Sequence, residues 1–163
     1  MDHKLRVTDL TTFLSGEMRS LVGILHRERC SLVLRDAAGQ VRTFSKPGVR
    51  DLEHLLDHEP EMLRGALIAD KVIGKAAAGM AAYGGVRAVY ADVLSRRAIP
   101  LLEANGIPYA YAALCERIIR PEGDTRCPLE QIVEPAFTAA EVVSLLRDHF
   151  AAMQAERKKI GKK

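Results

Sequence analysis

The sequence predicts an α/β domain built as a three-layer α/β/α sandwich around a mixed sheet of about five strands. Short apolar runs alternate with segments whose apolar residues recur at helical spacing, which is typical of such folds. Two early runs are joined by a turn too short for a crossover, so they must pair antiparallel. The later runs are separated by whole helices, which favours parallel strands with right-handed crossovers.

Length and composition fit one globular domain. The chain has 163 residues, of which 48% are hydrophobic and 28% are charged. No apolar run approaches the roughly 20 residues that span a bilayer, and the N-terminus lacks the apolar core of a signal peptide. Three cysteines at irregular spacing do not suggest a disulfide framework. We therefore expect a cytoplasmic protein without a membrane segment.

The first half of the chain should contain a helix, a hairpin and a second helix. The first helix is expected at residues 15–27, with Ser15 as its N-cap. Residues 30–35 and 41–44 should form the antiparallel hairpin. Asp51 can cap a short leucine-rich helix that ends before Pro60.

The second half should alternate strands with helices. We expect strands at residues 63–69, 86–93 and 107–113, and helices at residues 71–83, 95–105 and 127–133. Gly84-Gly85 and Gly106 are helix stops, and Ser95 is a helix cap. Thr138 and Glu141 form a capping-box pattern for the last helix. Its buried face should consist of Val142, Val143, Leu145, Leu146 and Phe150.

The chain has no internal repeat and no dividing linker. We expect residues 1–155 to form a single domain and residues 156–163 to be a disordered basic tail. The formal net charge of +3 comes largely from this tail. No aromatic side chains are interleaved with its basic residues, so it gives no strong signal for nucleic-acid binding.

The segment from Asp70 to Ala78 is the first candidate site, because a carboxylate and two lysines stand where a strand is expected to meet a helix. Asp70 is expected either to cap that helix or to bind a ligand as well. Lys71 and Lys75 would share one helix face near the helix N-terminus, where the helix dipole is positive and a bound anion would offset the added charge. Alternatively, Lys75 could simply be solvated. Gly74 indicates a close approach of a ligand or tight packing.

The segment around Cys127 is the second candidate site. A thiol at a helix N-terminus next to Arg126 should have a lowered pKa, which favours the reactive thiolate. A nucleophile also needs a positioned base, and no histidine lies nearby in the sequence. Glu130 shares the helix face of Cys127 and could accept a hydrogen bond from a ligand or from Lys71.

Three motifs in one order resemble a known family. They are Gly48-Val49 before a leucine-rich helix, Asp70-Lys71-Val72-Ile73-Gly74-Lys75-Ala76, and Cys127-Pro128-Leu129-Glu130-Gln131. Over residues 20–147 the chain resembles the bacterial and archaeal family catalogued as domain of unknown function 1893. The resemblance implies a cytidine-deaminase-like fold and does not imply an established biochemical function.

The resemblance also allows a comparison with zinc deaminases, in which a His-x-Glu and a Pro-Cys-x-x-Cys supply the zinc ligands and the proton shuttle. Here Asp70 would take the place of the histidine and Val72 that of the glutamate, while Cys127 and Glu130 would stand in the two later ligand places. An apolar side chain cannot move protons. This comparison implies that the protein does not deaminate cytidine, with a divalent metal at Asp70, Cys127 and Glu130 as a weak alternative.

The leading interpretation is a non-deaminating domain, without a cofactor, that binds a small polar or anionic ligand. By fold analogy the ligand would be nucleoside- or nucleotide-like. One alternative is an enzyme that uses Cys127 as nucleophile or a divalent metal at Asp70, Cys127 and Glu130. Another is a protein-interaction module. A homodimer is the default assembly. The residues expected to line one pocket are Asp70, Lys71, Gly74, Lys75, Cys127 and Glu130.

Overall fold

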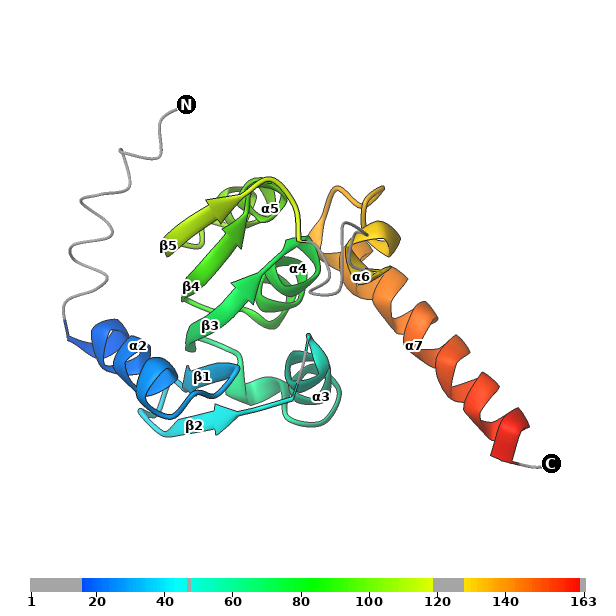
Figure 1. Ribbon diagram of the computed structural model, residues 1–163, viewed down its shortest axis with the longest axis horizontal. Coiled ribbons are helices and arrows are strands. Elements are labelled where there is room, and N and C mark those ends of the chain that lie inside the picture. The colour runs from blue at the N-terminus through cyan, green and yellow to red at the C-terminus, as the bar shows by residue number, and fades with distance from the viewer. Residues whose placement is uncertain (1–15, 47, 119–127, 162–163) are drawn as a thin grey trace.

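The computed structural model describes residues 16–46, 48–118 and 128–161 (Figure 1). The helices are α2 (Glu17–Arg27), α3 (Arg50–His58), α4 (Lys75–Gly84), α5 (Ile99–Ala104), α6 (Pro128–Ile132) and α7 (Ala139–Gly161). The strands are β1 (Leu32–Arg35), β2 (Val41–Phe44), β3 (Leu67–Ile73), β4 (Ala88–Ser95) and β5 (Tyr109–Cys115). Short 3-10 turns at Pro60–Met62 and Arg96–Ala98 precede β3 and α5.

The five strands form one mixed sheet in the order β2-β1-β3-β4-β5. β1 pairs antiparallel with both β2 and β3, while β3, β4 and β5 are mutually parallel. The antiparallel hairpin and the parallel later strands confirm the predicted topology. β3 lies at the centre of the sheet, so its residues are the ones best placed to be covered on both faces.

Helices cover both faces of the sheet, which confirms the three-layer arrangement (Figure 1). On one face, the apolar side of α2 packs on the strands through a cluster formed by Met18, Leu21, Leu25, Cys30, Val33, Leu67, Ala69, Ala88, Tyr90 and Ala110. On the other face, α3, α4, α5 and α7 bury the larger cluster, to which the strands contribute Leu32, Leu34, Ile68, Ile73, Val89, Ala91, Leu94 and Tyr109. Burial of these side chains is the main favourable contribution to folding.

The start of the central strand differs from the prediction. Residues 63–66 were expected to begin β3, but they form a turn in which Leu63 N donates to Pro60 O and Ala66 N donates to Leu63 O. Gly65 has a φ of +74°, a backbone conformation that favours glycine. β3 therefore begins at Leu67, and the following helix begins at Lys75 instead of residue 71.

The helix caps are partly as predicted. Ser95 Oγ accepts a hydrogen bond from Arg97 N, and Thr138 with Glu141 forms a reciprocal capping box. The prediction that Asp51 is the N-cap of α3 is wrong, because Val49 occupies that position. The Asp51 carboxylate instead accepts a hydrogen bond from Lys46 N, at 3.0 Å, and so fastens the loop before the helix.

The last helix is longer than predicted, because it continues to Gly161. The first half of α7 packs against α4, with Val142 lying against Gly79. Residues 151–161 are exposed on all sides, and this half of the helix extends away from the sheet (Figure 1). Residues 156–161, expected to be a disordered tail, are therefore helical in the structure. Among the described residues, no helix combines the length and the hydropathy needed to cross a membrane.

Candidate functional site

Among the described residues, part of the parallel half of the sheet is exposed, on β3 and β5. Lys71 and Val72 are exposed on β3, and Ala112 and Ala113 are exposed on β5. Val72 retains 43% of its surface although it lies on the central strand. Residues of parallel strands are normally buried on both faces, so this exposure marks a surface on which a ligand or partner could rest.

The strands are irregular at the same place. Ile68 and Ile73 contribute to the same core cluster although they are five residues apart, and a regular strand would point them to opposite faces. The β3–β4 pairing also skips Lys71 and Asp92, although the register is the same on both sides of this gap. Irregularities of this kind often redirect side chains near functional sites.

Asp70 lies on β3 at the start of this open region and is partly buried. The prediction that it caps a helix is wrong, because the helix begins five residues later. Burial, with a smaller contribution from the nearby carboxylates of Asp51 and Asp92, raises the pKa of the Asp70 carboxyl from 3.8 to about 7. A hydrogen bond from Val72 N to Asp70 Oδ1, at 3.3 Å, opposes the shift. Asp70 is thus an acid that changes charge near neutral pH, a property common in functional sites.

The shifted pKa predicts a pH-dependent stability. Between about pH 4 and 7 the unfolded chain has lost the Asp70 proton while the folded chain retains it, so this group makes the folded state less stable as the pH rises. We expect Asp70→Asn, which cannot titrate, to raise the melting temperature at pH 8 and to leave it nearly unchanged at pH 4. Calorimetric melting of both proteins across this range measures the effect. A constant difference at every pH would contradict the shifted pKa.

Glu130 occupies the N-terminus of α4, the position where the sequence suggested an anionic ligand. Its side-chain oxygens accept hydrogen bonds from Lys75 N at 2.8 Å and from Ala76 N at 3.0 Å. A Cβ atom on Gly74 would lie 2.5 Å from Glu130 Oε1, so glycine is required for this approach. The protein therefore provides the carboxylate that compensates the helix dipole and pairs these backbone N–H groups.

Lys71 and Lys75 lie on different elements and make different contacts. Lys71 is exposed on β3, and its backbone N donates to Ser31 O. The Lys75 ammonium donates to Glu134 O at 2.8 Å. The expectation that Lys71 and Lys75 share a helix face is therefore wrong. The structure brings together Gly74, Lys75 and Glu130, while Asp70 and Lys71 belong to the open part of the sheet.

The structure does not support the alignment of Asp70 and Val72 with the deaminase motif. Asp70 and Val72 were aligned with residues that open a helix, but both lie on a strand. The first turn of α4 starts with Lys75 and Ala76, neither of which is a zinc ligand or a proton shuttle. The alignment failed because the expected boundary between β3 and the helix was about four residues too early.

A group of polar side chains that no sequence pattern indicates lies on the α2 side of the same strands. Asp92 Oδ1 accepts a hydrogen bond from Tyr90 Oη at 2.9 Å and lies 2.7 Å from His26 Nε2. Burial and the Asp92 contact raise the pKa of Tyr90 to about 12, so the phenol remains the donor. Only a contact between residues 66 positions apart reveals this group, and no local motif could indicate it.

The remaining candidate, Cys127, lies outside the described residues. Of the other cysteines, Cys30 is buried, as expected, and Cys115 is partly buried, and burial raises the pKa of both thiols. Within the part of the chain that the structure describes, no three His, Cys, Asp or Glu side chains are grouped so as to hold a metal ion.

Comparisons with known proteins give a family and a fold. The sequence profile of the family described as "Domain of unknown function (DUF1893)" matches residues 20–150. The crystal structure of a DUF1893 family protein from Thermotoga maritima is similar, with a TM-score of 0.75 and 22% sequence identity. The match covers 83% of this chain and 90% of that one, and at this identity it shows the fold alone. Among curated proteins, none matches the sequence.

Proposed function

The chain belongs to the family described as Domain of unknown function (DUF1893), and from the open sheet surface around Asp70 we propose that it is a non-deaminating domain that binds a small polar ligand. The observation that carries the proposal is a partly buried acid with a pKa of about 7 beside an exposed valine on the central strand. In its proton-bearing form Asp70 can donate to a ligand, and in its charged form it can accept from an amino or hydroxyl group.

The surroundings of Asp70 support both polar and apolar recognition. Val72 and Ala113 offer apolar surface, and the exposed Lys71 can pair with an anionic group of the ligand. A ligand that presents a polar base edge and a charged group, such as a nucleoside or a nucleotide, fits this combination. The absence of a zinc ligand and a proton shuttle from the first turn of α4 supports a binding role without deamination.

A binding experiment tests this function. We would record amide spectra of the isotope-labelled protein while adding nucleosides and their 5′-monophosphates, and measure ammonia release in parallel. The expected result is saturable shifts at Asp70, Val72 and Val93, without ammonia. Asp70→Asn should weaken binding at least tenfold through loss of a charge-assisted hydrogen bond, while Glu61→Gln, an exposed acid on a surface turn, should have no effect.

Two outcomes would contradict the proposal. If none of these probes shifts the open strand residues at millimolar concentration, the surface is better explained as a protein-interaction face. If ammonia is released in proportion to the protein and the release survives Asp70→Asn, the domain is an enzyme whose chemistry lies elsewhere, and the Cys127 alternative would be favoured.

A further inference from the structure

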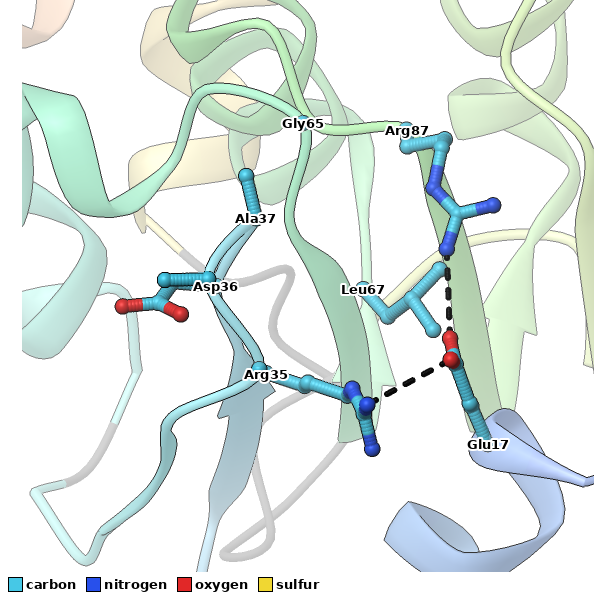
Figure 2. Close-up of a pocket in the computed structure, with 9 residues that line it drawn as sticks. Glu17, Arg35, Asp36, Ala37, Gly65, Leu67 and Arg87 are labelled. Carbon is cyan, nitrogen blue, oxygen red and sulfur yellow. Dashed lines mark hydrogen bonds and ion pairs between the residues drawn. The ribbon is translucent and has the colours of Figure 1, made fainter.

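A cavity of about 440 Å³ lies where β1 ends and β3 begins (Figure 2). Its volume is in the range of small-molecule sites. Arg35 ends β1, Leu67 begins β3, and Arg87 precedes β4. The two arginines therefore lie on either side of the central strand, at the end where β3 and β4 begin. Neighbouring strands are roughly 4.8 Å apart, which places the two arginine backbones roughly 10 Å from each other.

One carboxylate from α2 lies between the two guanidinium groups. Glu17 Oε1 is 3.4 Å from Arg35 Nη2, and Glu17 Oε2 is 3.4 Å from Arg87 Nη2 (Figure 2). Charge-assisted hydrogen bonds of arginine are typically 2.7–2.9 Å, so both contacts are long. Two positive groups therefore share a single negative charge that neither holds closely.

The other acid at the cavity is directed elsewhere. The Asp36 carboxylate points away from the two arginines in Figure 2, and its Oδ1 accepts a hydrogen bond from Gln40 N at 2.8 Å. Asp36 is thus engaged within the hairpin turn. Each guanidinium has five N–H donors, and Glu17 can satisfy only a small part of them.

The remaining walls are small and partly apolar. Ala37, Ala38, Gly39 and Gly65 leave room beside the arginines, and the Leu67 side chain lies between Arg35 and Arg87 in Figure 2. The cavity is larger than one tetrahedral anion. An anionic head between the arginines would therefore leave space for a small organic part against Leu67 and the alanines.

We propose that this cavity binds a small phosphomonoester, with its phosphate between Arg35 and Arg87 in place of the Glu17 carboxylate. A phosphate dianion matches the two positive charges, and its tetrahedral oxygens can accept bonds from two guanidinium groups on opposite sides. Glu17 is half exposed, so a change of its side-chain rotamer is enough to vacate the position. The same rotamer change opens the first turn of α2 to the phosphate. The helix dipole favours an anion at that position. This site is separate from the one proposed around Asp70.

Titration calorimetry with inorganic phosphate and with ribose 5-phosphate tests the proposal. We expect ribose 5-phosphate to bind more tightly than inorganic phosphate. Arg87→Ala should weaken its binding at least tenfold, because a charge-assisted pair is lost. Glu17→Gln should strengthen binding severalfold, because it removes the competing charge while keeping the side-chain shape. Arg87 is 62% exposed, so its replacement should not disturb the fold.

Two control variants separate a built site from general attraction. Arg50→Ala removes one positive charge at the exposed start of α3 and should leave the affinity unchanged. Asp70→Asn should also leave it unchanged, which keeps this test independent of the function proposed above. The proposal is overturned if neither probe binds at millimolar concentration, if Arg50→Ala and Arg87→Ala weaken binding equally, or if Glu17→Gln weakens it. Equal affinities for the two probes would overturn the assignment of a phosphomonoester.

Discussion

Replacing Glu130 by alanine is expected to lower the free energy of unfolding by about 2 kcal/mol, because it removes the acceptors from one buried and one partly buried N–H group at the start of α4. The two hydrogen bonds, from Lys75 N and Ala76 N, connect α6 with α4 across more than 50 residues of sequence. Urea denaturation monitored by circular dichroism measures the loss. Glu130→Gln keeps one acceptor oxygen and should lose about half as much.

The same contact predicts a strong coupling between Glu130 and Gly74. In the natural protein, Gly74→Ala should cost about 1–3 kcal/mol, because the added methyl group would overlap the Glu130 carboxylate. In the Glu130→Ala background the overlap is gone, and Gly74→Ala should cost little. The backbone of Gly74, with φ −101° and ψ −170°, is open to alanine, so no conformational penalty remains.

A double-mutant cycle of these variants therefore gives a coupling energy of at least about 1 kcal/mol. Additive losses would show that Glu130 and Gly74 do not meet as described. Because both residues belong to the motifs that identify the family resemblance, a large coupling would assign those motifs a structural role in joining α4 to α6.

Glycine-to-alanine substitutions in two helices are expected to change the free energy of unfolding in opposite directions. A Cβ on Gly79 of α4 would lie 2.6 Å from Val142 Cβ, so Gly79→Ala should lower the free energy of unfolding by about 1–3 kcal/mol through overpacking against α7. Gly23 of α2 is exposed and has nothing within 4 Å of the same position. Gly23→Ala should therefore raise the free energy of unfolding by up to about 1 kcal/mol through helix propensity.

Thermal melting of the two variants beside the natural protein is sufficient to test the pair. Each variant is the matched control of the other, since both add one methyl group inside a helix. Stabilisation by Gly79→Ala would show that α7 does not pack closely on α4.

The sequence alone determined the fold class, because hydrophobic periodicity and turn chemistry are local properties. The hairpin of β1 and β2, the alternation of later strands with helices, the Ser95 cap and the capping box at Thr138 all follow from residues close together in the chain. These features depend on φ/ψ preferences and nearby hydrogen bonds, which a sequence pattern expresses directly.

Only the tertiary structure decided where β3 ends and what lies around the candidate residues. The sequence Ala66 to Ala78 is apolar enough to fit a strand or a helix at several boundaries. β1 pairs with β3 only as far as Asp70, and pairing with β4 extends the strand to Ile73. That extension moves Asp70 and Lys71 from a helix start onto an open sheet. The cap that Glu130 supplies to α4, and the contacts of Glu17 with Arg35 and Arg87, join residues 18 to 70 positions apart. Such contacts depend on how the chain packs in three dimensions, and no local pattern of residues specifies them.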